Sequence, residues 1–433
     1  MTDRVVTADL ATTPYWWDAA PRPHLAQAPL PARVDVAVIG SGCTGLAAAL
    51  ALARAGRSVA VLEAGDPGQG ASSRATGVLG RTLKHGFSQI LAESGEAPAK
   101  RAYGAARIAF DFIIDLIGRE GIECHLRRCG RFIGANSPAH YEALARDLEA
   151  KRRHLGDESE MVPRAEQHRE IASDFFHGGG VIPDHRQLHP GLYQLGLMER
   201  AMAAGAVVHG RTPVTGLRRE ADGIELRTAR GAVRARHVVA ATNGYTGPAT
   251  RWLQRRVVPI DAYMVTTEPM DPARLKALLP HGRTFHDYTI NADYGVPAPH
   301  EPRLLFGGLT GERAEDLPGK AAALHARMLR FFPQLADLRF SHVWTGRCAG
   351  AFDLYPHIGE KDGVHYGMGF CFGSGLPIGT WFGDVIARRI LGARDAGTAF
   401  DDLAFAARFF YWGNPWFMPL VMRYYRWVDR RGF

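Results

Sequence analysis

Residues 34–62 decide the fold, and they begin VDVAVIGSGCTG. Val34 to Ile39 is a short run of mostly β-branched apolar residues, which is typical of a strand buried on both faces of a parallel sheet. Gly40 to Gly45 match G-x-G-x-x-G, and the Ala and Leu run from Leu46 to Ala55 predicts a helix. Residues 57–62 predict a second strand. This order of strand, glycine turn, helix and strand indicates an α/β fold of the Rossmann type.

Each part of this pattern suits a dinucleotide. The first Gly allows a tight turn, the second lets the backbone approach a pyrophosphate, and the third lets the helix pack close to the sheet. The amino terminus of the helix then offers free N–H groups and a partial positive charge. Glu63 ends the second strand, where a carboxylate accepts hydrogen bonds from both ribose hydroxyls and disfavours the 2′-phosphate of NADP. A Gly-rich turn in some other α/β domain is the alternative.

The fourteen residues after Glu63 read AGDPGQGASSRATG. A plain NAD domain would continue into a crossover helix, whereas these small, polar residues suit a segment that lies against a ligand. Here the sequence resembles the FAD-dependent amine and amino-acid oxidoreductases of the D-amino-acid oxidase superfamily, most closely the γ-glutamylputrescine oxidase branch. That branch also reads Gly-Ala-Ser, then an Arg and glycines, and it begins with a Tyr-Trp arm like residues 15–17. It usually has an Asn where Ala75 stands in this chain.

The resemblance implies FAD as the cofactor, with residues 64–77 running past the ribityl chain and under the flavin ring. Residues 367–379, which read GMGFCFGSGLPIG, match a turn of the family whose following helix points its amino terminus at the pyrimidine ring. The helix dipole there would stabilise negative charge on the reduced ring. Ser374 stands where the family often has a His.

The expected cofactor contacts come from the glycine motif, the segment after Glu63, a site near Val214, the turn at 242–244 and the closing turn. They are Gly40, Ser41, Gly42, Cys43, Thr44, Gly45, Glu63, Ala64, Ser72, Ser73, Arg74, Thr76, Gly77, Val214, Thr242, Asn243, Gly244, Cys348, Gly373, Ser374, Gly375, Leu376 and Pro377. In the sarcosine oxidase relatives, a Cys in the turn that corresponds to Cys348 is bonded to the flavin 8α-methyl group. Arg347 would favour the thiolate that such a bond needs. A small buried thiol is the favoured alternative.

The candidate catalytic residues are Arg81, His85, Tyr288 and Arg347. Arg81 and His85 follow the flavin-contacting segment, and Arg347 precedes the closing turn. If the substrate carries a carboxylate, Arg81 or Arg347 would be its bidentate partner. Four aromatic residues could line a substrate pocket, with ordinary strand packing as the alternative for each: Tyr263, Tyr288, Tyr294 and Phe306.

The resemblance implies oxidation of a C–N bond in a small amine or amino acid, by hydride transfer to flavin N5, with O2 as electron acceptor. The alternatives are a dehydrogenase that passes electrons to a quinone or carrier protein, and a flavin-binding electron-transfer subunit without its own substrate. The expected architecture is a Rossmann-type FAD-binding lobe (34–85, 181–256 and 346–391) and an antiparallel-sheet substrate lobe (86–180 and 257–345). Residues 1–33 are expected to form an extended arm.

The amino-acid composition also indicates which partners and cellular settings are expected. The net charge of +8, from 52 basic and 44 acidic residues spread along the chain, does not indicate nucleic-acid binding. Five scattered Cys favour a reducing, cytoplasmic setting. The chain has no apolar run of eighteen residues, so no transmembrane segment is expected.

Two further segments need an interpretation. His185 and His189 are four residues apart, but prolines flank them and no third ligand follows, so a loop that caps the next helix is expected rather than a metal site. Residues 392–433 are rich in aromatic residues and Arg. Such a tail fits a peripheral membrane contact, a subunit interface or packing on the protein's own surface.

Overall fold

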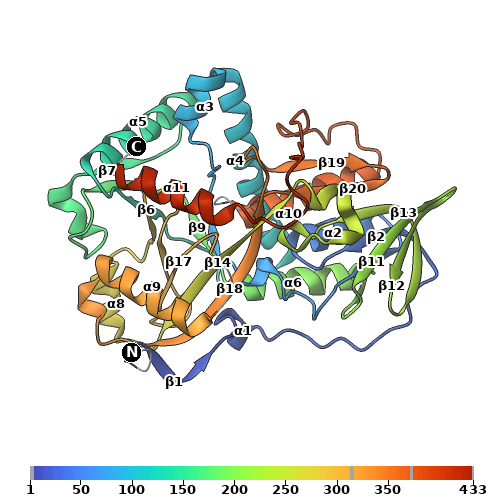
Figure 1. Cartoon of the computed structure of the whole chain (residues 1–433), viewed down its shortest axis with the longest axis horizontal. Helices are drawn as coiled ribbons and strands as arrows, with labels where there is room; N and C mark the ends of the chain where they lie inside the picture. Colours follow the sequence, from blue (N-terminus) through green and yellow to red (C-terminus); the bar gives the residue numbers. More distant parts are fainter. Residues whose placement is uncertain (1–3, 313–315, 371–373, 432–433) are drawn as a thin grey trace.

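The computed structural model describes residues 4–312, 316–370 and 374–431. Within these ranges the strands form two large sheets and one small one, and the two large sheets occupy opposite halves of the molecule (Figure 1). The α/β fold class is therefore confirmed.

The eight-stranded sheet has a parallel core built around the motif that opens the chain. Its strands come from the three segments expected to bind FAD, and the parallel members are β10, β3, β2, β13 and β20. Valines and alanines dominate β2 and β3, because both faces of these strands are covered. In order along the sheet, the strands are β10 (Val207–His209), β3 (Val59–Leu62), β2 (Arg33–Ile39), β13 (Gly231–Ala240), β12 (Gly223–Thr228) and β11 (Val214–Glu220), with β20 (Val364–Met368) and β19 (His357–Lys361) beside β13.

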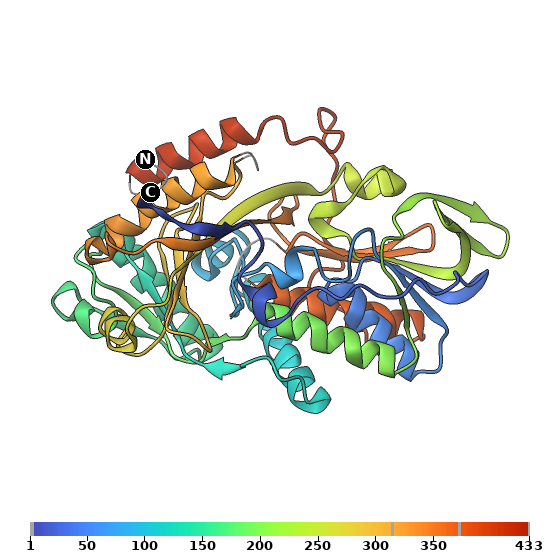
Figure 2. The same cartoon turned by 90° about the horizontal axis from the view of Figure 1, so that it is seen from below.

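Helices cover one face of this sheet, as Figure 2 shows below the strands. They are α2 (Cys43–Arg54), α4 (Glu96–Glu120), α6 (Pro190–Ala203) and α10 (Gly375–Ile390). Gly383 lets α10 approach α2 closely, because a Cβ there would lie 2.3 Å from the carbonyl oxygen of Thr44. The antiparallel strands β11 to β13 pack on the other face through Ile224, Leu226 and Val233.

The nine-stranded sheet is largely antiparallel, as expected of the substrate lobe, with parallel pairing only of β1 with β18 and β15 with β6 among the described strands. In order, its strands are β1 (Val6–Ala11), β18 (Phe340–Gly350), β14 (Val258–Thr267), β17 (Leu304–Gly308), β16 (Tyr294–Pro297), β15 (Thr284–Asp287), β6 (Arg131–Gly134), β8 (Gly179–Ile182) and β7 (Glu160–Val162). The small sheet has the order β4 (Val78–Leu79), β9 (Arg186–Gln187) and β5 (Arg127–Arg128).

The pleat of the nine-stranded sheet separates a core face from a cavity face. Tyr263 and Phe306 point into a core with α9 (Leu317–Phe331), so both belong to strand packing rather than to a pocket. Ile260 and Met264, on the alternate positions of β14, line the cavity. The remaining helices are α3 (Phe87–Ser94), α5 (Pro138–Leu155), α7 (Arg251–Gln254) and α8 (Pro272–Leu278).

The amino-terminal arm contributes β1 to the large sheet and a single turn of helix, α1 (Trp16–Ala19). Trp16 is fully buried, and its indole N–H donates to the carbonyl oxygen of Ala75 at 2.9 Å. The Trp17 indole N–H donates to Ser73 Oγ at 2.9 Å. The arm therefore holds the segment that follows Glu63.

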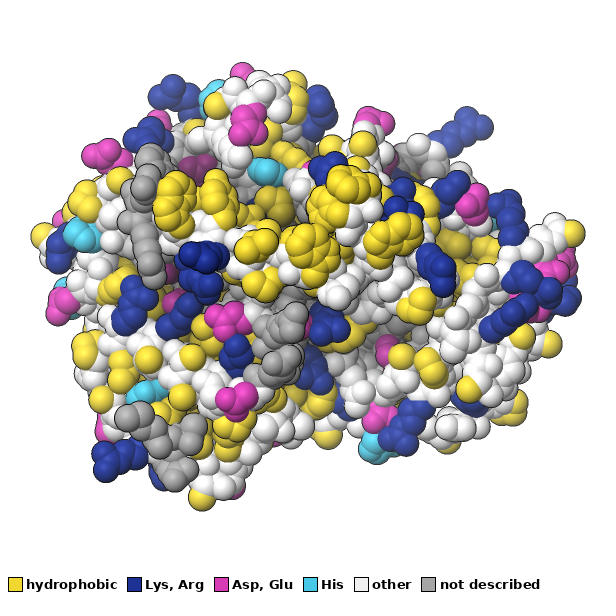
Figure 3. Space-filling view, viewed as in Figure 1, with side chains coloured by type: hydrophobic (Ala, Val, Ile, Leu, Met, Phe, Trp, Pro, Cys, Tyr) yellow, Lys and Arg dark blue, Asp and Glu magenta, His cyan; other side chains and the backbone are white. Residues whose placement is uncertain are grey.

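The carboxyl-terminal tail packs back on the protein through α11 (Met418–Arg431). Met418 and Met422 join a core cluster with Ile260 and Tyr411. The outer side of the tail carries exposed aromatic residues, visible as a yellow band in Figure 3: Phe409, Trp412, Trp416, Tyr424 and Trp427. Membrane contact through this band stays a prediction. Among the described residues, no helix is long and apolar enough to span a bilayer.

Candidate active site

One cavity of about 1580 Å³ runs between the two large sheets. Residues from the glycine motif line one part of it and residues from the nine-stranded sheet line another. The predicted cofactor contacts that line it are Gly40, Gly42, Cys43, Thr44, Glu63, Ala64, Ser72, Arg74, Thr76, Val214, Thr242, Asn243, Cys348, Gly375 and Leu376. Ser41, Gly45, Ser73, Gly77, Gly244, Ser374 and Pro377 lie behind this wall, and Gly373 lies outside the described residues.

The glycine turn leaves room for a phosphate group close to the backbone of the motif. Gly40 has φ +103°, and a Cβ there would lie 3.0 Å from the carbonyl oxygen of Ala241. A Cβ on Gly45 would lie 2.1 Å from the carbonyl oxygen of Gly40, so the first turn of α2 packs directly on the motif. This narrow cradle at a helix amino terminus fits the pyrophosphate of FAD.

Glu63 lines the cavity but is already largely engaged. Its Oε2 accepts hydrogen bonds from the Ser41 N–H at 2.8 Å and the Ser41 hydroxyl at 2.7 Å. Its Oε1 accepts one from the Gly65 N–H at 3.1 Å. Because a carboxylate has about four acceptor sites, one site on Oε1 remains for a ribose hydroxyl. Glu63 therefore both shapes the motif and fits the adenosine end of FAD.

The segment after Glu63 is fixed by bonds from several elements. The Arg74 side chain donates to the carbonyl oxygens of Gln69 at 2.7 Å and Thr345 at 3.0 Å, and it lies over the Trp17 ring. Burial lowers the pKa of Arg74. These contacts give Arg74 a role in holding the segment in place beside the cavity.

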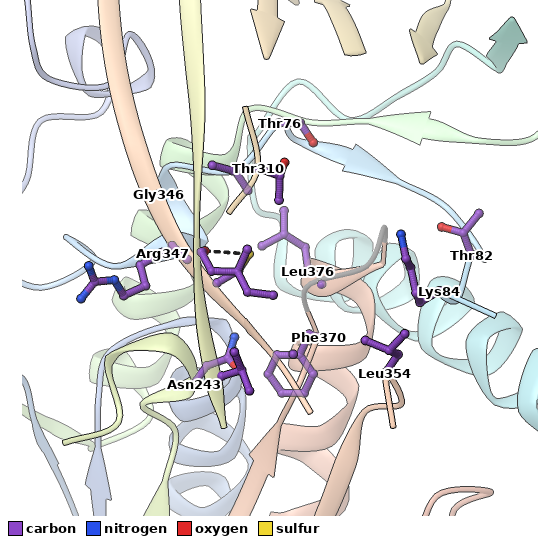
Figure 4. A pocket seen from close by; sticks show the side chains of 18 of the residues that line it. Thr76, Thr82, Lys84, Asn243, Thr310, Gly346, Arg347, Leu354, Phe370 and Leu376 are labelled. Carbon is purple, nitrogen blue, oxygen red and sulfur yellow. Dashed lines mark hydrogen bonds between the residues drawn. The ribbon is translucent and has the colours of Figure 1, made fainter. Parts of the chain in front are cut away.

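In the closing turn, Ser374 has a structural role. Ser374 is fully buried, and its hydroxyl donates to the carbonyl oxygen of Gly80 at 2.8 Å while accepting from the Thr82 N–H at 2.9 Å. The residue that replaces the family's His therefore joins the start of α10 to the loop after β4. Leu376, from the first turn of α10, and Phe370 lie close together in the cavity (Figure 4).

The turn at residues 242–244 meets β18 at Cys348. A Cβ on Gly244 would lie 2.4 Å from the carbonyl oxygen of Cys348, so only glycine allows this approach. Asn243 Oδ1 accepts a hydrogen bond from the Gly369 N–H at 3.1 Å. The half-buried Cys348 thiol contacts the carbonyl oxygen of Ile260 at 3.4 Å, within a strand rather than in a turn.

His85 and Tyr288 both lie on the cavity wall. His85 Nε2 is 2.8 Å from the carbonyl oxygen of Asp353, and its ring stacks on Tyr355. Burial raises the pKa of the Tyr288 phenol, which packs edge-on against His140. Tyr294 is a third aromatic residue on this wall. These side chains line the cavity, and their contact with a substrate stays a prediction.

The two predicted carboxylate partners are each engaged by acids of the chain. Arg81 is buried outside the cavity, where it forms ion pairs with Asp184 and, at 3.4 Å, Asp157. Arg347 forms a bidentate pair with Asp261 at 2.8 and 3.1 Å. Its guanidinium points away from Leu376 and Phe370 (Figure 4). Because both guanidinium groups already pair with Asp side chains, neither is available for bidentate binding of a substrate carboxylate.

Sequence reasoning missed other parts of the cavity wall. Arg131 and His286 line it from adjacent strands β6 and β15, and α11 lines it with residues spaced three and four apart: Met418, Val421, Met422, Tyr425 and Asp429. That helical spacing was the available signal for α11. For Arg131, the signal was a charged residue within the apolar strand RFIG.

The His pair does not gather metal ligands. Among the described residues, no group of three or more His, Cys, Asp or Glu side chains could hold a metal ion. His189 instead caps α6, since its Nδ1 accepts from the Leu192 N–H at 3.1 Å, which confirms the capping prediction. Burial and the nearby His300 lower the pKa of His189 to about 3.

Known proteins resemble this chain over most of its length. A probable oxidoreductase OrdL from Haemophilus influenzae is 26% identical over 374 residues, covering 85% of each chain. The gamma-glutamylputrescine oxidoreductase of Escherichia coli is 29% identical over 371 residues, which are 85% of this chain and 86% of that one. The crystal structure of glycine oxidase from Geobacillus kaustophilus shares the fold, with a TM-score of 0.73 at 24% identity over 88% of this chain and 99% of that chain.

The family described as FAD dependent oxidoreductase (DAO) matches residues 35–389. This span starts in β2 and ends in α10, so it covers both halves of the cavity. It agrees with the fit of the glycine turn and Glu63 to FAD. The chain therefore belongs to the DAO family of FAD-dependent oxidoreductases.

Proposed function

We propose that this enzyme oxidises the C–N bond of a small amine or amino acid and uses O2 as its electron acceptor. The observation that carries the proposal is that one continuous cavity joins the FAD cradle to the open face of the nine-stranded sheet. A molecule on that sheet would lie beside the cofactor. The similarity to gamma-glutamylputrescine oxidoreductase and to glycine oxidases supports this substrate class.

FAD, when bound, supplies the redox chemistry: N5 accepts a hydride equivalent from the carbon next to nitrogen, and water hydrolyses the resulting imine. The chain supplies binding and orientation. With FAD bound, the start of α2 would face the pyrophosphate, and the N–H groups at the start of α10 would stabilise negative charge on the reduced ring. Met418, Val421 and Met422 of α11 add apolar side chains to the cavity wall.

Anaerobic stopped-flow mixing of the holoenzyme with a panel of amines and amino acids tests this proposal. At least one should bleach the flavin absorbance, and admission of O2 should restore the absorbance and yield hydrogen peroxide. If dithionite bleaches the flavin while the whole panel leaves it oxidised, the proposed substrate class is wrong. Restoration by a quinone but not by O2 would contradict the oxidase assignment and favour a dehydrogenase.

We also propose that FAD is held without a covalent bond to Cys348. Asp261 neutralises the adjacent Arg347, which removes the cation expected to favour a thiolate. Acid precipitation should therefore release all yellow colour into the supernatant, from the wild type and from Cys348→Ser alike. Flavin that stays with the wild-type polypeptide and leaves Cys348→Ser would contradict this proposal.

A further inference from the structure

Arg131 is a buried cation on the cavity wall without an acidic partner in the described chain. The residue is only 6% exposed, yet it lines the cavity. No hydrogen bond or ion pair joins its side chain to another described residue, in contrast to the engaged Arg81 and Arg347. A Cβ on Gly80 would lie 3.1 Å from Arg131 Nη2, so the guanidinium packs against the loop that Ser374 holds.

The titratable neighbours of Arg131 offer it no negative charge. Lys151 engages Asp147 at 2.6 Å, and Arg81 engages Asp157 and Asp184. Burial first, and then the charge of Arg131, lowers the pKa of both His185 and His286, so both imidazoles are neutral. Arg131 therefore leaves an uncompensated positive charge on this wall. A buried charge without a partner is strongly unfavourable unless a ligand supplies the counter-charge.

The residues around Arg131 indicate what kind of ligand group could bind it. The pleat of β6 places Arg131 and Ile133 on the cavity side, and α5 adds Leu144 and Leu148. An anionic group bound here would therefore have apolar walls beside it. In the sheet order, β6 lies five strands from β18, roughly 24 Å along the sheet at the usual strand spacing, so this region is separate from Arg347 and Cys348.

We propose that Arg131 binds the carboxylate of the substrate, so that the substrate is an amine that also carries a carboxylate. This inference rests on the proposed amine oxidation and narrows it. A planar guanidinium with two free N–H edges matches a carboxylate in bidentate geometry, and the apolar wall excludes competing water. Arg131 is then a substrate-binding residue that sets specificity.

Ligand binding to the holoenzyme tests the site without turnover. The probes are straight-chain carboxylates from acetate to hexanoate and the matching neutral amides, followed by flavin absorbance and melting temperature. We expect the carboxylates to bind and to raise the melting temperature, while the amides do neither. Arg131→Met should weaken carboxylate binding about 10- to 100-fold. The same substitution should leave the melting temperature of the ligand-free holoenzyme unchanged or higher, because it removes an unpaired buried charge.

The matched control is Arg128→Met, which removes a largely exposed Arg three residues earlier and outside the cavity. It should bind the carboxylates as the wild type does. Arg131→Lys should retain part of the affinity, since it keeps the charge and loses the fork. The assignment would be overturned if the wild type and Arg131→Met bound the carboxylates with equal affinity. It would also be overturned if the melting temperature of Arg131→Met were several degrees lower while probe binding was unchanged.

Flavin reduction separates this inference from the function on which it rests. If butylamine bleaches the flavin as fast as 4-aminobutanoate and every other amino carboxylate, the oxidation stands and the role of Arg131 is overturned. If no amine bleaches the flavin although Arg131→Met loses carboxylate binding, the amine oxidation and the substrate role fail, and only an anion site remains.

Discussion

Glu63 and Arg131 are both charged residues on the same cavity wall, but their surroundings are opposite. In the cofactor half, the Glu63 carboxylate accepts three hydrogen bonds from Ser41 and Gly65. In the substrate half, the Arg131 guanidinium has no such partner among the described residues. The charge of Glu63 is largely satisfied by hydrogen bonds within the chain, whereas the charge of Arg131 has no such partner among the described residues.

This difference suits the two tasks. A resident cofactor needs a rigid cradle, and the glycine turn of residues 40–45 supplies it with close backbone packing. A substrate must leave after each turnover, so its site can keep an unpaired, buried binding charge at a cost in stability. The following predictions test this contrast, from the largest expected effect to the smallest.

Gly45→Ala should abolish FAD retention, because the new Cβ would lie 2.1 Å from the carbonyl oxygen of Gly40 and would push α2 off the motif. The control is Gly104→Ala in α4, where a Cβ would meet nothing within 4 Å. That change should stabilise the fold by about 0.5–1 kcal/mol and leave the protein yellow. Flavin content after gel filtration measures both variants, and a yellow Gly45→Ala protein would show that the cradle is less rigid than described.

Arg81→Met should lower the free energy of unfolding by about 3–5 kcal/mol, because it leaves Asp184 without its buried partner, while Asp157 keeps its ion pair with Arg107. Arg347→Met should lower it by less than about 1 kcal/mol, since that pair is half exposed and screened by solvent. Urea unfolding measures both. A carboxylate-probe affinity that falls in Arg81→Met as much as in Arg131→Met would contradict the division between structural and binding arginines.

The pH dependence of the melting temperature of Asp287→Asn tests whether the Asp287 carboxyl group in the substrate half has a raised pKa. Burial and the neighbouring Asp293 raise the pKa of Asp287 to about 7. Its folded pKa exceeds the unfolded value, so its contribution to stability is complete below about pH 4 and is lost as pH rises through 7. The variant should therefore melt at a higher temperature than the wild type at pH 8, and at a similar temperature at pH 5.

The exposed Asp222 provides the comparison, and Asp222→Asn should show no such pH-dependent gap. An Asp287→Asn variant that melts below the wild type at both pH 5 and pH 8 would mean that the carboxylate is charged and stabilising in the folded protein. That result would contradict the raised pKa of Asp287 on this wall.

The sequence predicted the cofactor half well because its signals are local. The strand, the glycines and Glu63 lie within thirty residues, and each conformation follows from the residue type. Residues 64–77 were also recognisable, although the buried Trp16 and the partly buried Trp17 that hold them come from the amino-terminal arm.

The substrate half could not be predicted in the same way, because what matters there is pairing between distant segments. Arg81 and Arg347 were plausible carboxylate partners until Asp184 and Asp261 were found beside them. Arg131 gained its significance only when no acid was found next to it. Hydrophobic periodicity indicates which face of a strand is buried, but it does not show whether a charge on that strand has a partner.

The contrast between Glu63 and Arg131 is tested most directly by measuring two affinities in two variants. FAD affinity is obtained by titrating deflavinated protein, and carboxylate affinity by titrating the holoenzyme with hexanoate. We predict that Glu63→Gln weakens FAD binding about 10- to 100-fold and leaves hexanoate affinity unchanged, while Arg131→Met does the reverse. If Arg131→Met weakens FAD as much as Glu63→Gln does and hexanoate binding persists in it, the division of the cavity into a cofactor half and a substrate half is contradicted.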